Sequence, residues 1–129
     1  MKTTDMKFTV LLFVVLPFLF VSCQNGEPEQ NEGYKQLDSA AFDAALAAET
    51  DPQLIDVRTR TEYERGHLPG ARLLDIRERK FAEGLQALDK SRPVYVYCQS
   101  GGRSARACSQ LTDLGFERVV ELKDGYGGR

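Results

Sequence analysis

Residues 95–108 read YVYCQSGGRSARAC, an apolar run that ends at a cysteine and is followed by a glycine-rich turn. The residues after Arg103 have the pattern of a helix. A cysteine between a buried strand and a helix N-terminus lies at the carboxyl edge of a parallel sheet, where α/β proteins bind ligands. We therefore expect Cys98 to mark the functional site.

Strand-like and helix-like segments alternate along the rest of the chain. This alternation predicts an α/β fold with a mostly parallel central sheet of about five strands and helices on both faces. Strands are expected over residues 54–57, 71–74, 93–97 and 118–122. Helices are expected from the cap Asp38 to about Ala48, from the cap Thr61 to Gly66, over residues 76–88, and over residues 104–114.

Composition is typical of one globular domain. The 129 residues are 42% hydrophobic and 28% charged, which suits a single core. The formal net charge is −2, and no run of Lys and Arg forms a basic stripe. Nucleic acid is therefore not expected as a partner.

The N-terminus has the pattern of a secretory signal peptide. A start with two lysines precedes an apolar run over residues 8–21, which is too short to span a bilayer as a helix. The run ends in FVSC, which resembles the lipobox of bacterial lipoproteins, with Phe20 where that motif usually has Leu. The resemblance implies that residues 1–22 are a signal peptide and that Cys23 carries lipid. A membrane-anchored lipoprotein of the bacterial cell envelope, on the periplasmic or surface side, is the expected location.

The residues after Cys23 carry almost no apolar surface. Residues 24–33 read QNGEPEQNEG and include three glutamates, so they cannot form a core. Residues 23–33 are therefore expected to be a lipidated, flexible acidic tether, and residues 34–129 the folded domain.

Several roles are open to Cys98. A zinc site is not expected, because one histidine and two cysteines do not supply the usual four ligands. A hydrolase would need His67 beside Cys98, yet His67 lies in a Gly-His-Leu-Pro-Gly turn. A disulfide to Cys108 suits an oxidising compartment, but Cys108 lies more than one turn into the next helix and is expected to pack as a small apolar residue. A purely structural cysteine at a strand end also remains possible.

The turn after Cys98 favours an anion. Small residues in it let backbone N–H groups point inward, and the helix N-terminus adds partial positive charge. Arg103 adds a full positive charge, and Ser104 is expected to cap the helix and to donate to the sulfur. These groups predict a lowered Cys98 pKa and a site for an anionic group attached to the sulfur.

Two motifs together resemble the single-domain form of the rhodanese-like family. They are DVRTRTEYERGHLPGA (56–71) and VYCQSGGRS (96–104), and the resemblance covers residues 34–128. It implies the three-layer rhodanese-like fold and sulfurtransferase activity without a cofactor or metal. Cys98 would take a sulfane sulfur from a small donor such as thiosulfate and pass it to a thiol or a cyanide-like acceptor. No protein partner is implied. The persulfide would be bound by the loop residues Gln99, Ser100, Gly101, Gly102, Arg103 and Ser104.

The same resemblance assigns supporting roles. Arg103 is expected to orient an anionic donor. Asp56 and Arg58 are expected to form a structural ion pair near the site, and Glu62 and His67 to brace the loop.

Loop length separates this reading from a related one. Cys-dependent phosphatases have Cys-x5-Arg, whereas this chain has Cys-x4-Arg, and the shorter loop favours a sulfur atom over phosphate. A phosphatase and a non-catalytic rhodanese-like binding or sulfur-sensing module are the alternative functions.

The C-terminal residues depart from the family pattern. The family usually has a Gly-Gly-x-x-x-Trp-like segment followed by a short helix, whereas the sequence here ends in KDGYGGR. Gly125, Gly127 and Gly128 are expected to form the glycine-rich turn near the site, with a less complete wall beyond it.

Overall fold

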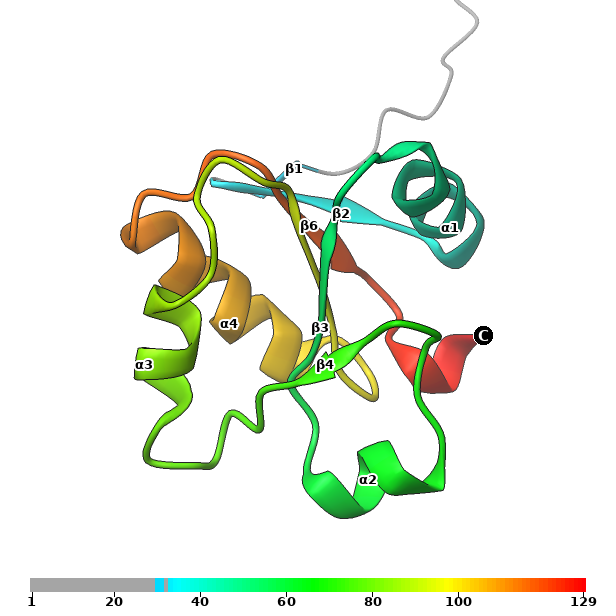
Figure 1. The fold of residues 1–129 in the computed structure, drawn as a ribbon. Coiled ribbons are helices and arrows are strands. Elements are labelled where there is room, and N and C mark those ends of the chain that lie inside the picture. Colours follow the sequence, from blue (N-terminus) through cyan, green and yellow to red (C-terminus); the bar gives the residue numbers. More distant parts are fainter. Residues whose placement is uncertain (1–29, 32) are drawn as a thin grey trace, which may run out of the picture.

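The computed structural model describes residues 30–31 and 33–129 (Figure 1). The expected alternation of strands and helices is present within them. The strands are β1 (Gln30–Asn31), β2 (Tyr34–Leu37), β3 (Gln53–Asp56), β4 (Arg72–Leu73), β5 (Val94–Tyr97) and β6 (Val119–Leu122). The helices are α1 (Ser39–Ala48), α2 (Arg60–Arg65), α3 (Phe81–Gln86), α4 (Gly102–Asp113) and the 3₁₀ turn η1 (Tyr126–Gly128).

One sheet organises the domain. Its strand order is β1-β2-β6-β5-β3-β4. Five of the strands run parallel, and only β1 pairs antiparallel, with β2. The predicted α/β fold is therefore confirmed, with β5 at the centre of the sheet and its carboxyl end leading directly to Cys98.

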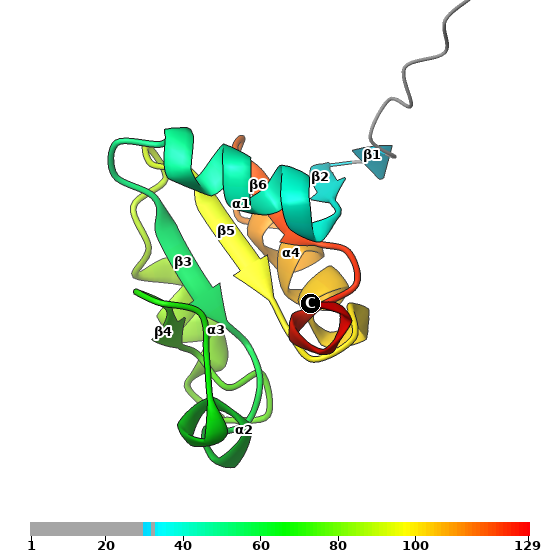
Figure 2. The same cartoon turned by 90° about the vertical axis from the view of Figure 1, so that its right-hand side faces the viewer.

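Helices cover both faces of the sheet, as Figures 1 and 2 show together. Side chains of β5 alternate between the two faces because successive residues of a strand point in opposite directions. Val94 and Val96 pack with the buried residues of α3 and α4, whereas Tyr95 and Tyr97 pack on the other face with Phe42 of α1. All four β5 residues are buried, as expected for a central parallel strand.

Helix α4 is held to the sheet by a stripe of small and apolar side chains. Ser104, Ala107, Cys108 and Leu111 are its buried residues, at the i, i+3, i+4, i+7 spacing of one helix face. Cys108 is fully buried and free, so it packs in the core as predicted.

Several boundaries differ from the sequence-based expectations. Helix α2 is capped by Thr59 rather than Thr61, because Thr59 accepts from the N–H of Glu62 and completes a capping box with it. Helix α3 is shorter than predicted, because residues 76–80 form turns and a bend before it begins. The sequence reading also missed β2, and residues 30–31 of the predicted tether form β1 through backbone pairing, which needs no apolar side chain.

The predicted signal peptide and Cys23 lie outside the described residues. Within residues 30–31 and 33–129, none of the helices combines the length and the apolar character that a bilayer span requires.

Candidate active site

Cys98 lies at the end of β5, where the sheet meets α4. The residue is 1% exposed. Gly101 ends the loop in a left-handed conformation with φ of 98°, and a Cβ at this position would lie 2.5 Å from the Lys123 carbonyl oxygen. Only glycine fits this turn. The helix therefore begins at Gly102 with Gly101 as its cap, and the prediction that Ser104 is the capping residue is wrong.

The turn surrounds the Cys98 sulfur with hydrogen-bond donors. The Gly101 N–H donates to Sγ at 3.1 Å, and the Ser104 Oγ lies 3.4 Å from it. Burial alone would raise the pKa of Cys98, but hydrogen bonds from the Ser104 hydroxyl and from the N–H groups of Ser104, Ser100 and Gly101 outweigh it and lower the pKa. These hydrogen bonds therefore favour the thiolate of Cys98 relative to an ordinary cysteine.

Arg103 joins the loop to α2. Its guanidinium makes two parallel hydrogen bonds to the Glu62 carboxylate, both at 2.7 Å. The hydrogen bond from Arg103 holds the pKa of Glu62 well below its usual range. The pKa of Arg103 is raised, chiefly by Glu62 and further by the negative charge of Cys98. The guanidinium therefore lies within electrostatic reach of the sulfur.

Asp56 and Arg58 form a buried ion pair at the end of β3. The Arg58 Nη2 lies 2.7 Å from the Asp56 Oδ2, and their side chains are 2% and 0% exposed. Arg58 also donates to the Gln99 side chain at 3.1 Å and to the Gly66 carbonyl at 2.7 Å. The pair thus ties the end of β3 to the loop after Cys98 and to the end of α2.

The residues after β6 close over the loop. The Tyr126 N–H donates to the Cys98 carbonyl at 2.8 Å, and the Gly127 N–H donates to the Gln99 carbonyl at 2.9 Å. The Tyr126 ring lies 4.2 Å from the Arg58 guanidinium carbon. The glycine-rich turn is thus beside the site, and η1 forms the wall there.

His67 lies apart from this network. Its side chain is exposed and stacks on the Tyr63 ring at a centroid distance of 3.7 Å, and its Nδ1 is 2.9 Å from the Tyr63 carbonyl oxygen. It therefore braces the end of α2.

Sequence reasoning missed one buried side chain of the site. Glu121 of β6 is 0% exposed, and the Ser104 hydroxyl lies 2.6 Å from its carboxylate. A single carboxylate inside the apolar stretch RVVEL was the available signal.

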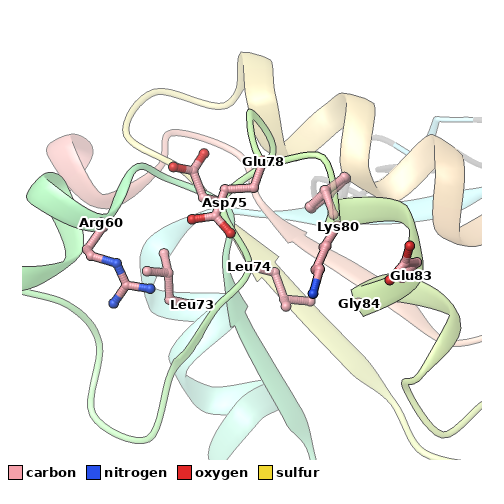
Figure 3. A pocket seen from close by; sticks show the side chains of 9 residues that line it. Arg60, Leu73, Leu74, Asp75, Glu78, Lys80, Glu83 and Gly84 are labelled. Atoms are coloured by element: carbon pink, nitrogen blue, oxygen red, sulfur yellow. The ribbon is translucent and has the colours of Figure 1, made fainter.

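A hollow of about 370 Å³ opens beside the loop. Arg58, Arg65, Gly66, Gln99 and Tyr126 are among the residues that line it. A second hollow, of about 330 Å³, lies between β4 and α3 and is ringed by charges of both signs, including Arg60, Asp75, Glu78 and Lys80 (Figure 3). Of residues 98–104, Gln99 lines the first hollow and none lines the second, so the first hollow is the one beside the candidate site.

No group of three or more potential metal-ligating side chains is found in the part of the chain that the structure describes.

Known proteins are similar to this chain in both sequence and fold. A family model described as the rhodanese-like domain matches residues 38–128. A sulfurtransferase of Allochromatium vinosum is 34% identical over 90 residues, which are 70% of this chain and 82% of that protein. A thiosulfate sulfurtransferase of Coxiella burnetii is 33% identical over 81 residues, covering 63% of this chain and 74% of that protein. The solution structure of a rhodanese-like domain from Anabaena sp. superposes with a TM-score of 0.63 at 33% identity, covering 72% of this chain and 70% of that one. The chain belongs to the rhodanese-like domain family.

Proposed function

We propose that the chain is a sulfurtransferase that carries a sulfane sulfur on Cys98 as a persulfide. The observation that carries this proposal is the environment of the sulfur. Cys98 follows the central strand, its pKa is lowered, and N–H groups of the turn point at Sγ. Such a turn stabilises a thiolate before the reaction and a persulfide anion after it. Relatives named as sulfurtransferases support the proposal.

The reaction has two steps that balance without a proton. In the first, the Cys98 thiolate attacks the sulfane sulfur of a donor such as thiosulfate. The donor S–S bond breaks, sulfite leaves with the electron pair, and a new bond forms between Sγ and the transferred sulfur. In the second, the thiolate of a thiol acceptor or a cyanide-like acceptor attacks the outer sulfur, and the bond between that sulfur and Sγ breaks. With cyanide, thiocyanate leaves and the Cys98 thiolate is restored.

The donor is a small anion in this proposal. Cys98 is 1% exposed, so only a slender molecule reaches its sulfur. Arg103 provides positive charge within reach of Cys98, and Arg65 lines the hollow beside the loop. A doubly charged donor such as thiosulfate is attracted by both.

The first test is intact-protein mass spectrometry of the purified protein before and after thiosulfate. The wild type is expected to gain one sulfur atom, which cyanide then removes. Cys98→Ser is expected to remain folded, to gain no sulfur and to form no thiocyanate, because the attacking atom is gone. Cys108→Ala is the matched control, since Cys108 is buried in the core, and it should still gain the sulfur.

A folded wild type that gains no sulfur would contradict the proposal. It would favour the non-catalytic binding or sensing module, which the near-complete burial of Cys98 makes the strongest alternative. Hydrolysis of an aryl phosphate by Cys98 would instead identify a phosphatase.

We also propose that the mature chain is attached to a membrane of the bacterial cell envelope through lipid on Cys23. The lipobox-like FVSC supports this location. The domain would then act at the periplasmic or outer surface of that membrane, on donors and acceptors that reach it there.

A further inference from the structure

Glu121 is a buried carboxyl group behind the candidate active site. It belongs to β6 and is 0% exposed. The Gln36 amide donates to its Oε2 at 2.8 Å, the Ser104 hydroxyl lies 2.6 Å from its Oε1, and Tyr34 also hydrogen-bonds to it. These partners are neutral. Burial raises the pKa of Glu121, and the hydrogen bonds oppose this only in part. The proton is therefore held more tightly on Glu121 than on an exposed glutamate.

Ser104 stands between Glu121 and Cys98. Its hydroxyl is fully buried, and it has one proton for three acceptors. These are the Glu121 Oε1 at 2.6 Å, the Gly101 carbonyl oxygen at 2.9 Å and the Cys98 sulfur at 3.4 Å. Only one of these three acceptors receives a full hydrogen bond from Ser104 at a time, so the protonation state of Glu121 decides which acceptor it is.

The two protonation states of Glu121 have opposite effects on Cys98. An ionised Glu121 accepts the hydrogen bond of the Ser104 hydroxyl, because hydrogen bonds to a carboxylate are stronger than those to a neutral oxygen. The Cys98 sulfur then loses a donor. A protonated Glu121 instead donates its own proton to the Ser104 oxygen. The Ser104 proton is then free to point at the Cys98 thiolate.

We propose that Glu121 is a positioning residue for sulfur transfer, which in its protonated form turns the Ser104 hydroxyl onto the Cys98 sulfur. The inference rests on the proposed function of Cys98. It predicts that a thiolate at Cys98 and a proton at Glu121 stabilise each other, so that the two groups titrate as a pair.

The other charged and titratable groups around this pair are few among the described residues. Arg103, paired with Glu62, faces Cys98 from α4. Tyr34 of β2 faces Glu121. Cys108 of α4 is affected by both Glu121 and Cys98. Burial, and then the negative charges of these two groups, raise the pKa of Cys108, which keeps it a neutral thiol. Cys108 therefore does not compete for the proton.

The test measures the Cys98 pKa from the pH dependence of its alkylation by iodoacetamide, which needs no sulfur donor. Ser104→Ala removes the hydroxyl that donates to the sulfur, and alkylation at neutral pH should fall about tenfold, as for the loss of a hydrogen bond to a charged group. Glu121→Gln should keep the wild-type rate at neutral pH, because its amide N–H donates to Ser104 as the acid does. Its pH profile should show one titration step, where the wild type shows the two steps of a coupled pair.

The combined variants test the connection through Ser104. In the Ser104→Ala background, Glu121→Gln should no longer change the pH profile of Cys98. If the wild-type profile had the same single step as that of Glu121→Gln, or if Ser104→Ala left the Cys98 pKa unchanged, the proposal would be overturned.

A second measurement reports the protonation of Glu121 directly. Infrared difference spectroscopy of wild type against Glu121→Gln at neutral pH should show the carbonyl band of a protonated carboxylic acid, and only in the wild type. Absence of that band would overturn the proposal. Neither measurement involves sulfur transfer, so failure here is distinct from failure of the mass spectrometry test.

Discussion

In the proposed function, the reactivity of Cys98 depends on making a nearly buried sulfur anionic. Burial opposes the thiolate, and the hydrogen bonds of the turn overcome that opposition. Arg103 adds positive charge, yet Glu62 neutralises much of it through two hydrogen bonds. Arg103 therefore has two roles in the proposed function, because it joins α2 to the loop and attracts the donor anion.

Arg103→Ala should weaken the use of anionic donors. We expect the KM for thiosulfate to rise about tenfold, which corresponds to about 1.4 kcal/mol of lost binding. Arg106→Ala is the matched control, since Arg106 lies on the same helix with an exposed side chain. Steady-state kinetics of thiocyanate formation measure both variants. An unchanged KM in Arg103→Ala would remove the donor-orienting role of this residue.

At the scale of the elements, the site is an assembly of strand ends and the segments that follow them. Arg58, just after β3, holds the loop after β5 through Gln99 and the end of α2 through Gly66. The segment after β6 holds the same loop through Tyr126 and Gly127. Parallel strands bring these ends to one edge of the sheet, so each segment can support its neighbour.

Asp56→Ala should strongly destabilise the domain. It leaves the Arg58 guanidinium buried without its partner, and such a loss costs about 3–5 kcal/mol. Asp51→Ala is the control, because its ion pair with Arg92 has side chains that are 71% and 35% exposed and should contribute less than about 1 kcal/mol. Urea unfolding at neutral pH compares the two. Similar losses of unfolding free energy in the two variants would mean that the buried ion pair stabilises the domain no more than the exposed one.

Gly125→Ala should distort the loop after Cys98. A Cβ at Gly125 would lie 2.5 Å from the Gln99 carbonyl carbon and oxygen, and its φ is 68°. Gly70 also has a positive φ, of 79°, but no atom lies within 4 Å of the added Cβ, so Gly70→Ala is a control without the close contact, at a conformational cost of about 1–2 kcal/mol.

We expect Gly125→Ala to lose at least about tenfold in sulfur transfer, whereas Gly70→Ala loses only stability. Thiocyanate assays and thermal unfolding distinguish these effects. Equal transfer rates in the two variants would show that the close contact of Gly125 with the loop does not position Cys98.

At the scale of the whole molecule, a small rhodanese-like domain follows the N-terminal segment that was read as a lipoprotein signal. The proposed reaction uses small donors and acceptors, so attachment would act on location rather than on chemistry.

Cys23→Ala should abolish lipid attachment. In bacteria grown with labelled palmitate, we expect label on the wild type and on Cys98→Ser, and none on Cys23→Ala, because Cys23 is the residue that would carry the lipid. Gel fluorography of the purified proteins reads this out. Label that persists on Cys23→Ala would disprove the assignment.

Local patterns in the sequence were sufficient for the fold class and for Cys98. The β5 strand, the glycine-rich turn and the α4 helix follow one another in the chain, so their residue types and periods predict them directly. The ion pair of Asp56 and Arg58 was expected from the resemblance to the rhodanese-like family, and the structure places these two residues together at the end of β3.

Only the tertiary structure decided which distant side chains complete the site. Arg103 meets Glu62 across 41 residues, and Ser104 meets Glu121 across 17. These contacts depend on strand order and on the register of β5 beside β6, which many residues set together and no local period encodes. The sequence by itself therefore determined the sulfur and its turn, while the packing of the sheet determined the groups that control the charge on that sulfur.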